Sequence, residues 1–346
     1  MATILGIEST CDETGAAVVI DGSFVRSNVV ASQVSLHEKY RGVVPEIASR
    51  AHIENILPVI REALALAACR FDDIDAIAVA HRPGLIGSLL IGVTAAKTLA
   101  WSIGKPLIGV DHVHAHLYSV MLDESPHIDL PAVGLVISGG HTSLYRVNSW
   151  TDVALLGSTI DDAVGEAYDK VAAILGLSYP GGPIVDELAA KGDPKAIRFP
   201  RSLLGRESLD FSFSGLKTAV LYHVRGVPKR YESRDASSPT APPPTGQELF
   251  DICASFQAAC IDTILRKLHR AAEQIAARSI VIGGGVSANR GLRNALSDFD
   301  LPVFFPPMQY CTDNAAMTAG LANLLLDAGQ RSGLDLDAVT YSQFRP

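Results

Sequence analysis

Two segments of the sequence share one pattern, an apolar strand, a tight turn and a returning strand, and this repeat constrains the fold most. In the first, TILGIES reads as a strand, TCDETG as a turn and AAVVI as the returning strand. In the second, PAVGLVIS (131–138) and HTSLYRV (141–147) flank a turn at Gly139 and Gly140. Two such openings predict an α/β protein with two related lobes rather than one doubly wound sheet.

The rest of the chain alternates predicted helices and buried strands, which supports the α/β class. Pro58 is expected to kink the first of these helices or to start a second one. The predicted strands cover 74–80, 106–110 and 279–285, and the predicted helices cover 45–68, 88–103, 161–176 and 250–277.

We predict that residues 1–108 and 318–346 form the N-terminal lobe, and that 109–317 form the second lobe, which carries the site. The segment 228–246 is rich in Pro, Ser and charged residues, so we predict a mobile surface loop there.

Composition restricts the class of protein. With 346 residues and 48% apolar side chains, the chain can bury a large core. The N-terminus has no basic start, and Gly92 and Lys97 interrupt the apolar stretch 85–103, so we expect neither a signal peptide nor a membrane span, and a cytoplasmic location. Five cysteines without a C-x-x-C pair argue against a disulfide framework or a zinc ribbon. The net charge of -8 gives no overall attraction to nucleic acid, although local basic clusters could still bind a backbone.

Three histidines occur within five residues in VDHVHAHLYSV (110–120). Asp111 is a good N-cap, so a helix is predicted to begin at His112. On that helix His112 and His116 share one face, whereas His114 points to the opposite side. The pair is either a metal site or two ordinary surface or capped histidines, and a third ligand would decide between them. The peptidase motif H-E-x-x-H requires Glu after the first histidine, where this chain has Val113, so a zincin-type hydrolase is disfavoured.

Two glycine loops follow apolar strands, ISGGH at 137–141 and GGGVSANRG at 283–291. Such loops either cradle a phosphate or carbonyl oxygen with backbone N–H groups or are simply tight turns. The second loop matches G-x-G-x-x-A, but Asp300 precedes the next strand instead of ending it, which argues against a nicotinamide cofactor.

Two acidic features remain ambiguous. Asp162, Glu166 and Asp169 form a stripe on the helix predicted over 161–176, and such a stripe is typical of a solvent-facing side. Asp313 stands where the last predicted helix begins, so its spacing alone favours an N-cap.

Taken together, these motifs resemble the tRNA threonylcarbamoyladenosine family in its bacterial form, TsaD, once described as a sialoglycoprotein endopeptidase. The resemblance spans nearly the whole chain, and only the 228–246 loop is longer than expected, so no family role carries over to it. The matching segments are GIESTCDETG, SQVSLHEKYRGVVPEIASRAH, RPGLIGSLL, DHVHAH, VISGGHT, GEAYDKVAAILGLSYPGGP, LDFSFSGLKTA, GGGVSANRGLR and CTDNAAM.

The resemblance implies a two-lobed actin-like ATPase fold of the ribonuclease H-like class, with the active site in the cleft. It implies that His112, His116 and Asp313 hold one divalent metal, Fe(II) in preference to Zn(II), and that His114 is not a ligand. It further implies a substrate site lined by Val136, Ile137, Ser138, Gly139, Gly140, Asp169, Gly182, Asp186 and Asn289. No separate general base is assigned.

The implied enzyme is a metal-dependent acyltransferase. It transfers the threonylcarbamoyl group from threonylcarbamoyl-AMP to the exocyclic amine of the adenosine 3′-adjacent to the anticodon, in tRNAs that read codons beginning with A. The implied partners are tRNA, a TsaB-like paralogous subunit and a TsaE-like P-loop ATPase, with no membrane. Two alternatives stay open, a metallopeptidase and a nucleotide-gated actin-like binding module, because fold alone does not fix chemistry.

Overall fold

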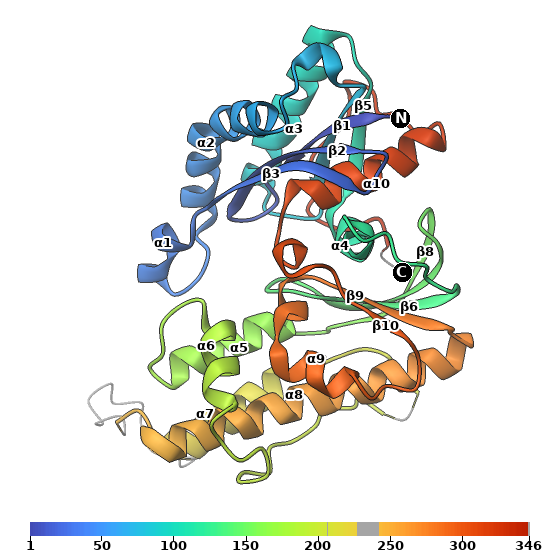
Figure 1. Ribbon diagram of the computed structural model, residues 1–346. Helices are drawn as coiled ribbons and strands as arrows, with labels where there is room; N and C mark the ends of the chain where they lie inside the picture. The colour runs from blue at the N-terminus through green and yellow to red at the C-terminus, as the bar shows by residue number, and fades with distance from the viewer. Residues whose placement is uncertain (206, 227–241, 345–346) are drawn as a thin grey trace.

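The computed structural model describes residues 1–205, 207–226 and 242–344, and it contains two five-stranded sheets (Figure 1). The first sheet has the order β3-β2-β1-β4-β5 and the second the order β10-β9-β6-β7-β8. The strands of the first are β1 (Thr3–Glu8), β2 (Glu13–Ile20), β3 (Phe24–Ser32), β4 (Ala76–Arg82) and β5 (Leu107–Asp111). Those of the second are β6 (Ala132–Ile137), β7 (Thr142–Ser149), β8 (Asp152–Ser158), β9 (Ser279–Gly283) and β10 (Val303–Phe304).

The two sheets repeat one topology. In the first sheet, β1 is antiparallel to β2 and parallel to β4. In the second sheet, β6 is in the same way antiparallel to β7 and parallel to β9. The register Glu8↔Gly15 closes the first hairpin and Ile137↔Thr142 closes the second. The predicted duplication of α/β lobes is therefore confirmed, and β3 and β8 are strands that the sequence pattern did not reveal.

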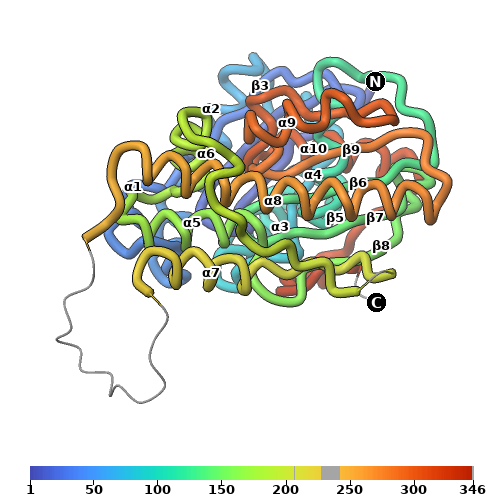
Figure 2. Tube along the Cα trace, turned by 90° about the horizontal axis from the view of Figure 1, so that it is seen from below, coloured from blue at the N-terminus to red at the C-terminus, as the bar shows by residue number. Residues whose placement is uncertain are grey.

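The lobes form five layers, which Figure 1 shows from top to bottom. Helices α2 (Pro45–Leu66) and α3 (Ile86–Ile103) cover the outer face of the first sheet, and α10 (Ala315–Asp327) covers its inner face. Helix α4 (His112–Tyr118) covers the inner face of the second sheet, and α5 (Val164–Ile174) and α8 (Gly246–Ile275) pack on its outer face. Figure 2 shows α8 running across the whole width of that outer side.

Alternating side chains of β1 show how one strand serves two cores. Leu5 and Ile7 pack toward α2 and α3, whereas Ile4 packs toward α10. Between them Gly6 lets α10 approach closely, because a Cβ there would lie 2.4 Å from the Ala315 carbonyl oxygen. Helices α10 and α4 pack together between the two sheets, so the ends of these helices meet at the lobe interface.

Several predicted boundaries differ from the structure. Helix α2 continues through Pro58, and α5 begins at Val164 rather than at Asp161. The turn predicted at 179–183 contains the start of α6 (Gly181–Ala189), and the sequence pattern also missed α7 (Ser214–Arg225). The lobe boundaries at 108/109 and 317/318 fall within β5 and α10 and stay a prediction. Most of the predicted 228–246 loop lies outside the described residues.

Helix α3 is the one helix in the described part of the chain that is long and apolar enough to cross a membrane. The helix predicted over 88–103 is confirmed, and Gly92 and Lys97 lie within it. One of its faces, with Leu89, Val93 and Ala96, is buried in the core against the first sheet, as in the core helices of α/β layers.

Candidate metal centre and cleft

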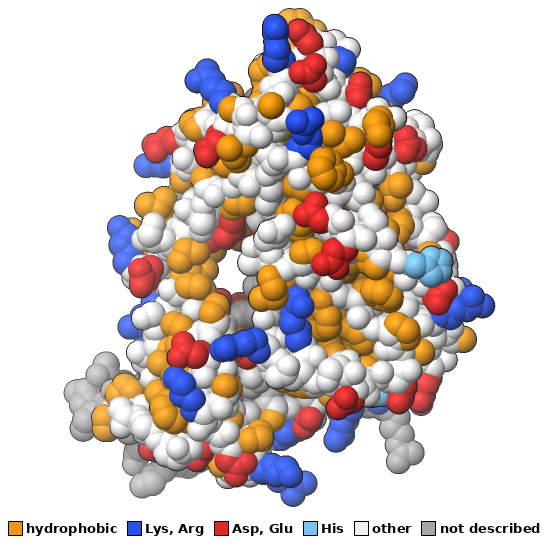
Figure 3. Space-filling view, in the orientation of Figure 1, with side chains coloured by type: hydrophobic (Ala, Val, Ile, Leu, Met, Phe, Trp, Pro, Cys, Tyr) orange, Lys and Arg blue, Asp and Glu red, His pale blue; other side chains and the backbone are white. Residues whose placement is uncertain are grey.

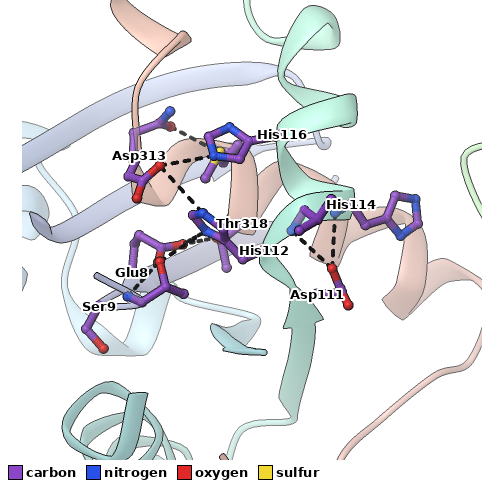
Figure 4. Close-up of polar contacts among 12 residues, drawn as sticks. Glu8, Ser9, Asp111, His112, His114, His116, Asp313 and Thr318 are labelled. Atoms are coloured by element: carbon purple, nitrogen blue, oxygen red, sulfur yellow. Dashed lines mark hydrogen bonds and ion pairs between the residues drawn. The ribbon is translucent and has the colours of Figure 1, made fainter. Parts of the chain in front are cut away.

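Helix α4 carries the histidines, and Asp111 sets where this helix begins. One carboxylate oxygen of Asp111 accepts hydrogen bonds from the N–H groups of Val113 and His114, at 3.0 and 3.2 Å. The predicted N-cap and helix start are thus confirmed. His112 and His116 point to one side of α4 and His114 to the other, as Figure 4 shows.

Asp313 lies opposite the histidine pair, just before α10. Its Oδ1 is 3.0 Å from His116 Nε2 and 3.5 Å from His112 Nε2. The interpretation of Asp313 as a helix cap is wrong, because Asn314 is the cap and accepts the Met317 N–H at 3.0 Å. The Asp313 side chain is therefore free to meet the imidazoles.

Opposite charges hold the three side chains together. Burial alone would lower the pKa of His112, but the carboxylates of Glu8 and Asp313 outweigh it and raise this pKa to about 9. Burial, and then the neighbouring His112, lower the pKa of His116. Burial opposes ionisation of Asp313, yet His112 and His116 hold the pKa of this carboxyl below its ordinary value. The carboxylates of Glu8 and Asp313 thus favour the protonated form of His112.

Glu8, at the end of β1, is a functional candidate that the sequence did not reveal. Its carboxylate is fully buried, and Oε2 lies 3.2 Å from His112 Nδ1. The same oxygen accepts the hydroxyl of Thr318 at 3.2 Å, and Oε1 accepts the Thr10 N–H at 2.9 Å. Because Nδ1 of His112 is engaged by Glu8, its Nε2 is left to face Asp313, the arrangement that a metal-ligating histidine requires.

The described residues contain one group of this kind suited to a metal ion. The ligand atoms of His112, His116 and Asp313 lie within 4.8 Å of one another, and both imidazoles are buried. Two imidazole nitrogens and a carboxylate oxygen form a donor set that suits a divalent transition metal. The group could therefore hold one metal ion.

The two glycine loops lie side by side next to this group. Strands β6 and β9 are parallel neighbours, with Val136 paired to Gly283, so their following loops emerge at one sheet edge. A Cβ on Gly284 would lie 2.4 Å from the Ile137 carbonyl oxygen, and one on Gly285 would lie 3.8 Å from Thr312, the neighbour of Asp313. The loops and the metal group therefore lie next to one another.

The predicted residues Val136 to Gly140 form the end of β6 and its turn. Val136 and Ile137 are fully buried, whereas Gly139 and Gly140 are exposed and have nothing within 4 Å of an added Cβ. Ser138 closes the turn by donating its N–H to the His141 carbonyl at 2.8 Å. The backbone of the two glycines thus faces open space.

The other predicted substrate residues lie in two places, Asp169 and Gly182 at the start of α6, and Asp186 and Asn289 around Gln257. Asp169 accepts the Gly181 N–H at 2.7 Å, at the start of α6, and Gly182 beside it is open to space. Asp186 accepts the N–H of Gly291 at 3.2 Å and pairs with Arg290. Asn289 caps α9 (Arg290–Leu296) and, like Asp186, bonds to Gln257. Asp186 and Asn289 thus fix the end of the second glycine loop.

The acidic residues Asp162, Glu166 and Asp169 do not form one stripe on a helix, because Asp162 lies before α5. Asp162 precedes α5 and pairs with Lys170 and Lys217, at 2.6 and 2.8 Å, and Glu166 also pairs with Lys170. These two carboxylates are engaged in ion pairs, whereas Asp169 accepts the Gly181 N–H instead.

Further titratable residues near the metal group were missed from sequence. The ring centroid of His141 lies 6.4 Å from that of His112, and burial together with the two metal-site histidines lowers the pKa of His141 to about 4. Burial, and then Asp313 and Asp12, raise the pKa of Glu13 to about 10. In the sequence, the one indication of a functional role for His141 was its place after the Gly139–Gly140 turn, and for Glu13 its place in the first hairpin turn. Figure 3 shows a hollow between the lobes with acidic side chains around it.

Duplicated lobes around a His-His-Asp group that could hold one metal ion define a protein with the actin-like ATPase fold. Solved structures agree on the fold: HypF from T. kodakarensis superposes with a TM-score of 0.61 at 15% identity, covering 94% of this chain and 48% of HypF. Component A of (R)-2-hydroxyglutaryl-CoA dehydratase from Acidaminococcus fermentans gives 0.53 at 15% identity, covering 95% and 100%.

The chain belongs to the TsaD family, tRNA N6-adenosine threonylcarbamoyltransferase, whose family model matches residues 24–320. A curated relative of that name from Moorella thermoacetica is 53% identical over 323 residues, covering 91% of this chain and 89% of the relative. Another from Anaeromyxobacter dehalogenans strain 2CP-1 is 48% identical, covering 98% of both chains.

Proposed function

We propose that this chain is a metal-dependent acyltransferase that forms threonylcarbamoyladenosine in tRNA. It transfers the threonylcarbamoyl group from threonylcarbamoyl-AMP to the exocyclic amine of the adenosine 3′-adjacent to the anticodon, in tRNAs that read codons beginning with A. Family membership supports this reaction. The observation that carries it in the structure is the convergence of His112, His116 and Asp313 beside two open glycine loops.

The proposed metal is Fe(II), with Zn(II) as the alternative, held by His112, His116 and Asp313. Three protein ligands of this kind leave coordination positions open, as in catalytic rather than structural sites. A bound divalent ion supplies positive charge and Lewis acidity toward phosphate and carbonyl oxygens.

The residues of the chain have separate tasks in this reaction. The amine attacks the carbamoyl carbon, the bond from that carbon to the phosphate oxygen breaks, and AMP leaves as the amine gives up a proton. An aromatic amine is a weak nucleophile, so positioning and oxyanion stabilisation must lower most of the barrier. Backbone N–H groups of Gly139 and Gly140 are available to oxygens of the adenylate. The proposed substrate contacts are Val136, Ile137, Ser138, Gly139, Gly140, Asp169, Gly182, Asp186 and Asn289.

The target base must lie in an unpaired loop to enter a cleft of this kind, which fits an anticodon loop. Because the chain is acidic overall, we propose that other subunits help to hold tRNA. The proposed partners are a TsaB-like paralogue and a TsaE-like P-loop ATPase, all in the cytoplasm.

An apolar surface supports a protein partner. Ile53 and Leu57 on α2 are 61% and 51% exposed, and Ile86 and Leu90 on α3 are 48% and 45% exposed. Both pairs lie near the place where Ser49 of α2 meets α3, so large apolar side chains of two packed helices reach solvent.

The alternatives gain no support. A metallopeptidase of the H-E-x-x-H type needs a carboxylate after His112, and Val113 instead packs into the core against the second sheet. A pure nucleotide-gated binder does not require a metal site with open positions.

The proposal is tested with His112→Ala and, as a matched control, His127→Ala, whose side chain is 91% exposed. Metal content of the purified chains and threonylcarbamoyladenosine in tRNA, measured by nucleoside mass spectrometry with the partners present, are the readouts. We expect His112→Ala to lose both and His127→Ala to keep both. Retention of metal and product by His112→Ala refutes the assignment.

A further inference from the structure

The segment that follows α10 runs along the edge of the first sheet. Ser332 donates its N–H to the Leu107 carbonyl at 2.8 Å, and its hydroxyl accepts the Gly109 N–H at 2.9 Å. Farther on, Val339 donates its N–H to the His81 carbonyl at 2.9 Å. The segment is therefore fixed to β4 and β5, and β5 leads directly into α4.

This segment then reaches the residue at which the metal helix begins. One oxygen of Asp111 caps α4, as described above, and the other accepts the Ser342 hydroxyl at 2.7 Å and the Gln343 N–H at 3.0 Å. The Asp111 side chain is completely buried. One carboxylate thus joins the Ser342 hydroxyl and the Gln343 N–H to the first turn of α4, and the next residue after Asp111 is His112.

Phe344 continues onto the second lobe. Its ring contacts His114 at a centroid distance of 5.4 Å and Tyr145 of β7 at 5.7 Å, both in edge-to-face geometry. It packs on the cluster that includes Val113 and Leu117 of α4. His114, the histidine that points away from the metal group, therefore packs against Phe344 and has no part in the metal group.

We propose that Ser342, Gln343 and Phe344 are positioning residues for the metal ligands. They hold α4 from the side opposite the cleft, by its N-cap and by its apolar face. A helix of seven residues has little stability of its own, so its start and rotation depend on such contacts. Ligand atoms must be held within about 0.5 Å for tight binding, so a small rotation of α4 separates Nε2 of His112 and His116 from Asp313. The inference rests on the proposed metal site.

Co²⁺ binding to the purified full chain tests this role. The variants are Ser342→Ala and Phe344→Ala, with Ser342→Thr as the rescue and Ser332→Ala as the matched control. Ser332→Ala also removes a serine hydroxyl that bonds to the sheet edge, but at Gly109 rather than at Asp111. Affinity is measured by chelator competition, and geometry by the visible absorption of bound Co²⁺, each well below the melting temperature of the variant.

We expect Ser342→Ala and Phe344→Ala to bind Co²⁺ about 10-fold to 100-fold more weakly and with altered absorption, as for other outer-shell changes. Ser332→Ala and Ser342→Thr should stay within about threefold of the wild type. Wild-type affinity and spectrum in both test variants would overturn the inference, as would an equal loss in Ser332→Ala. Failure of the wild-type chain itself to bind Co²⁺ would instead overturn the proposed metal site.

Discussion

Replacing Glu8 by Gln changes the charge beside His112 and little else. The side chain is fully buried, and its carboxylate accepts hydrogen bonds from Thr10 and Thr318 as well as contacting His112 Nδ1 at 3.2 Å. Gln has nearly the same shape, so the lost negative charge is the main perturbation.

Two opposing effects on metal affinity follow. Loss of an outer-shell carboxylate weakens binding by about 10-fold to 100-fold, or about 1.4 to 2.7 kcal/mol. In the wild type, however, Glu8 and Asp313 outweigh burial and raise the pKa of His112 to about 9, and the metal must displace that proton. At pH 7 this proton competition lowers the metal affinity of the wild type about 100-fold. In Glu8→Gln the pKa of His112 falls, so most of this loss of affinity disappears.

The two effects separate by pH. We expect Glu8→Gln to bind Co²⁺ about 10-fold to 100-fold more weakly at pH 9.5, where no proton competes, and nearly as well as the wild type at pH 7. Chelator competition at both pH values measures this, with the exposed Glu54→Gln as the control. An equal loss at both pH values, or no loss at pH 9.5, would refute the role of Glu8.

Three further predictions concern stability. Gly283→Ala would place a Cβ 2.1 Å from the His116 carbonyl oxygen, so we expect the free energy of unfolding in urea to fall by about 2 kcal/mol or more. The control Gly215→Ala in α7 has nothing within 4 Å of the added Cβ and should change this free energy by less than about 1 kcal/mol. Equal stabilities of the two variants would contradict the close packing of β9 on α4. Asp161→Ala removes the acceptor of the Phe213 N–H, 2.8 Å away at the start of α7, and should cost about 1 to 2 kcal/mol near pH 7. Burial opposes ionisation of Asp161, but hydrogen bonds from Ser212 and Ser214 lower its pKa, so this stabilisation should be lost as pH falls below the ordinary value, and a pH-independent difference would argue against it. In the metal-free chain the raised pKa of His112 contributes up to about 3 kcal/mol to the free energy of unfolding. This contribution is fully present below pH 6.5 and is lost as pH rises through about 9. Thermal melts should therefore show the wild type losing stability over this window, and Glu8→Gln losing much less.

Local patterns predicted the parts of this molecule that depend on neighbouring residues. The two hairpins, the start of α4 at His112 and the two glycine loops follow from strand alternation, an N-cap and glycine turns within a dozen residues. The same patterns misplaced the start of α5 and missed α6 and α7, because these short helices are held by long-range contacts such as Asp161 with Ser214 and Asp169 with Gly181.

What the sequence determined by itself was the pair of imidazoles on one helix face, because helical spacing is a local property of the chain. Only the tertiary structure decided which side chains meet that pair. Asp313 lies 197 residues beyond His116, and Glu8 lies 104 residues before His112. They converge because α4 and α10 pack together between two sheets, so the end of β1 and the residue before α10 arrive at the same face. No local pattern encodes this packing, which the buried surfaces of both lobes determine together.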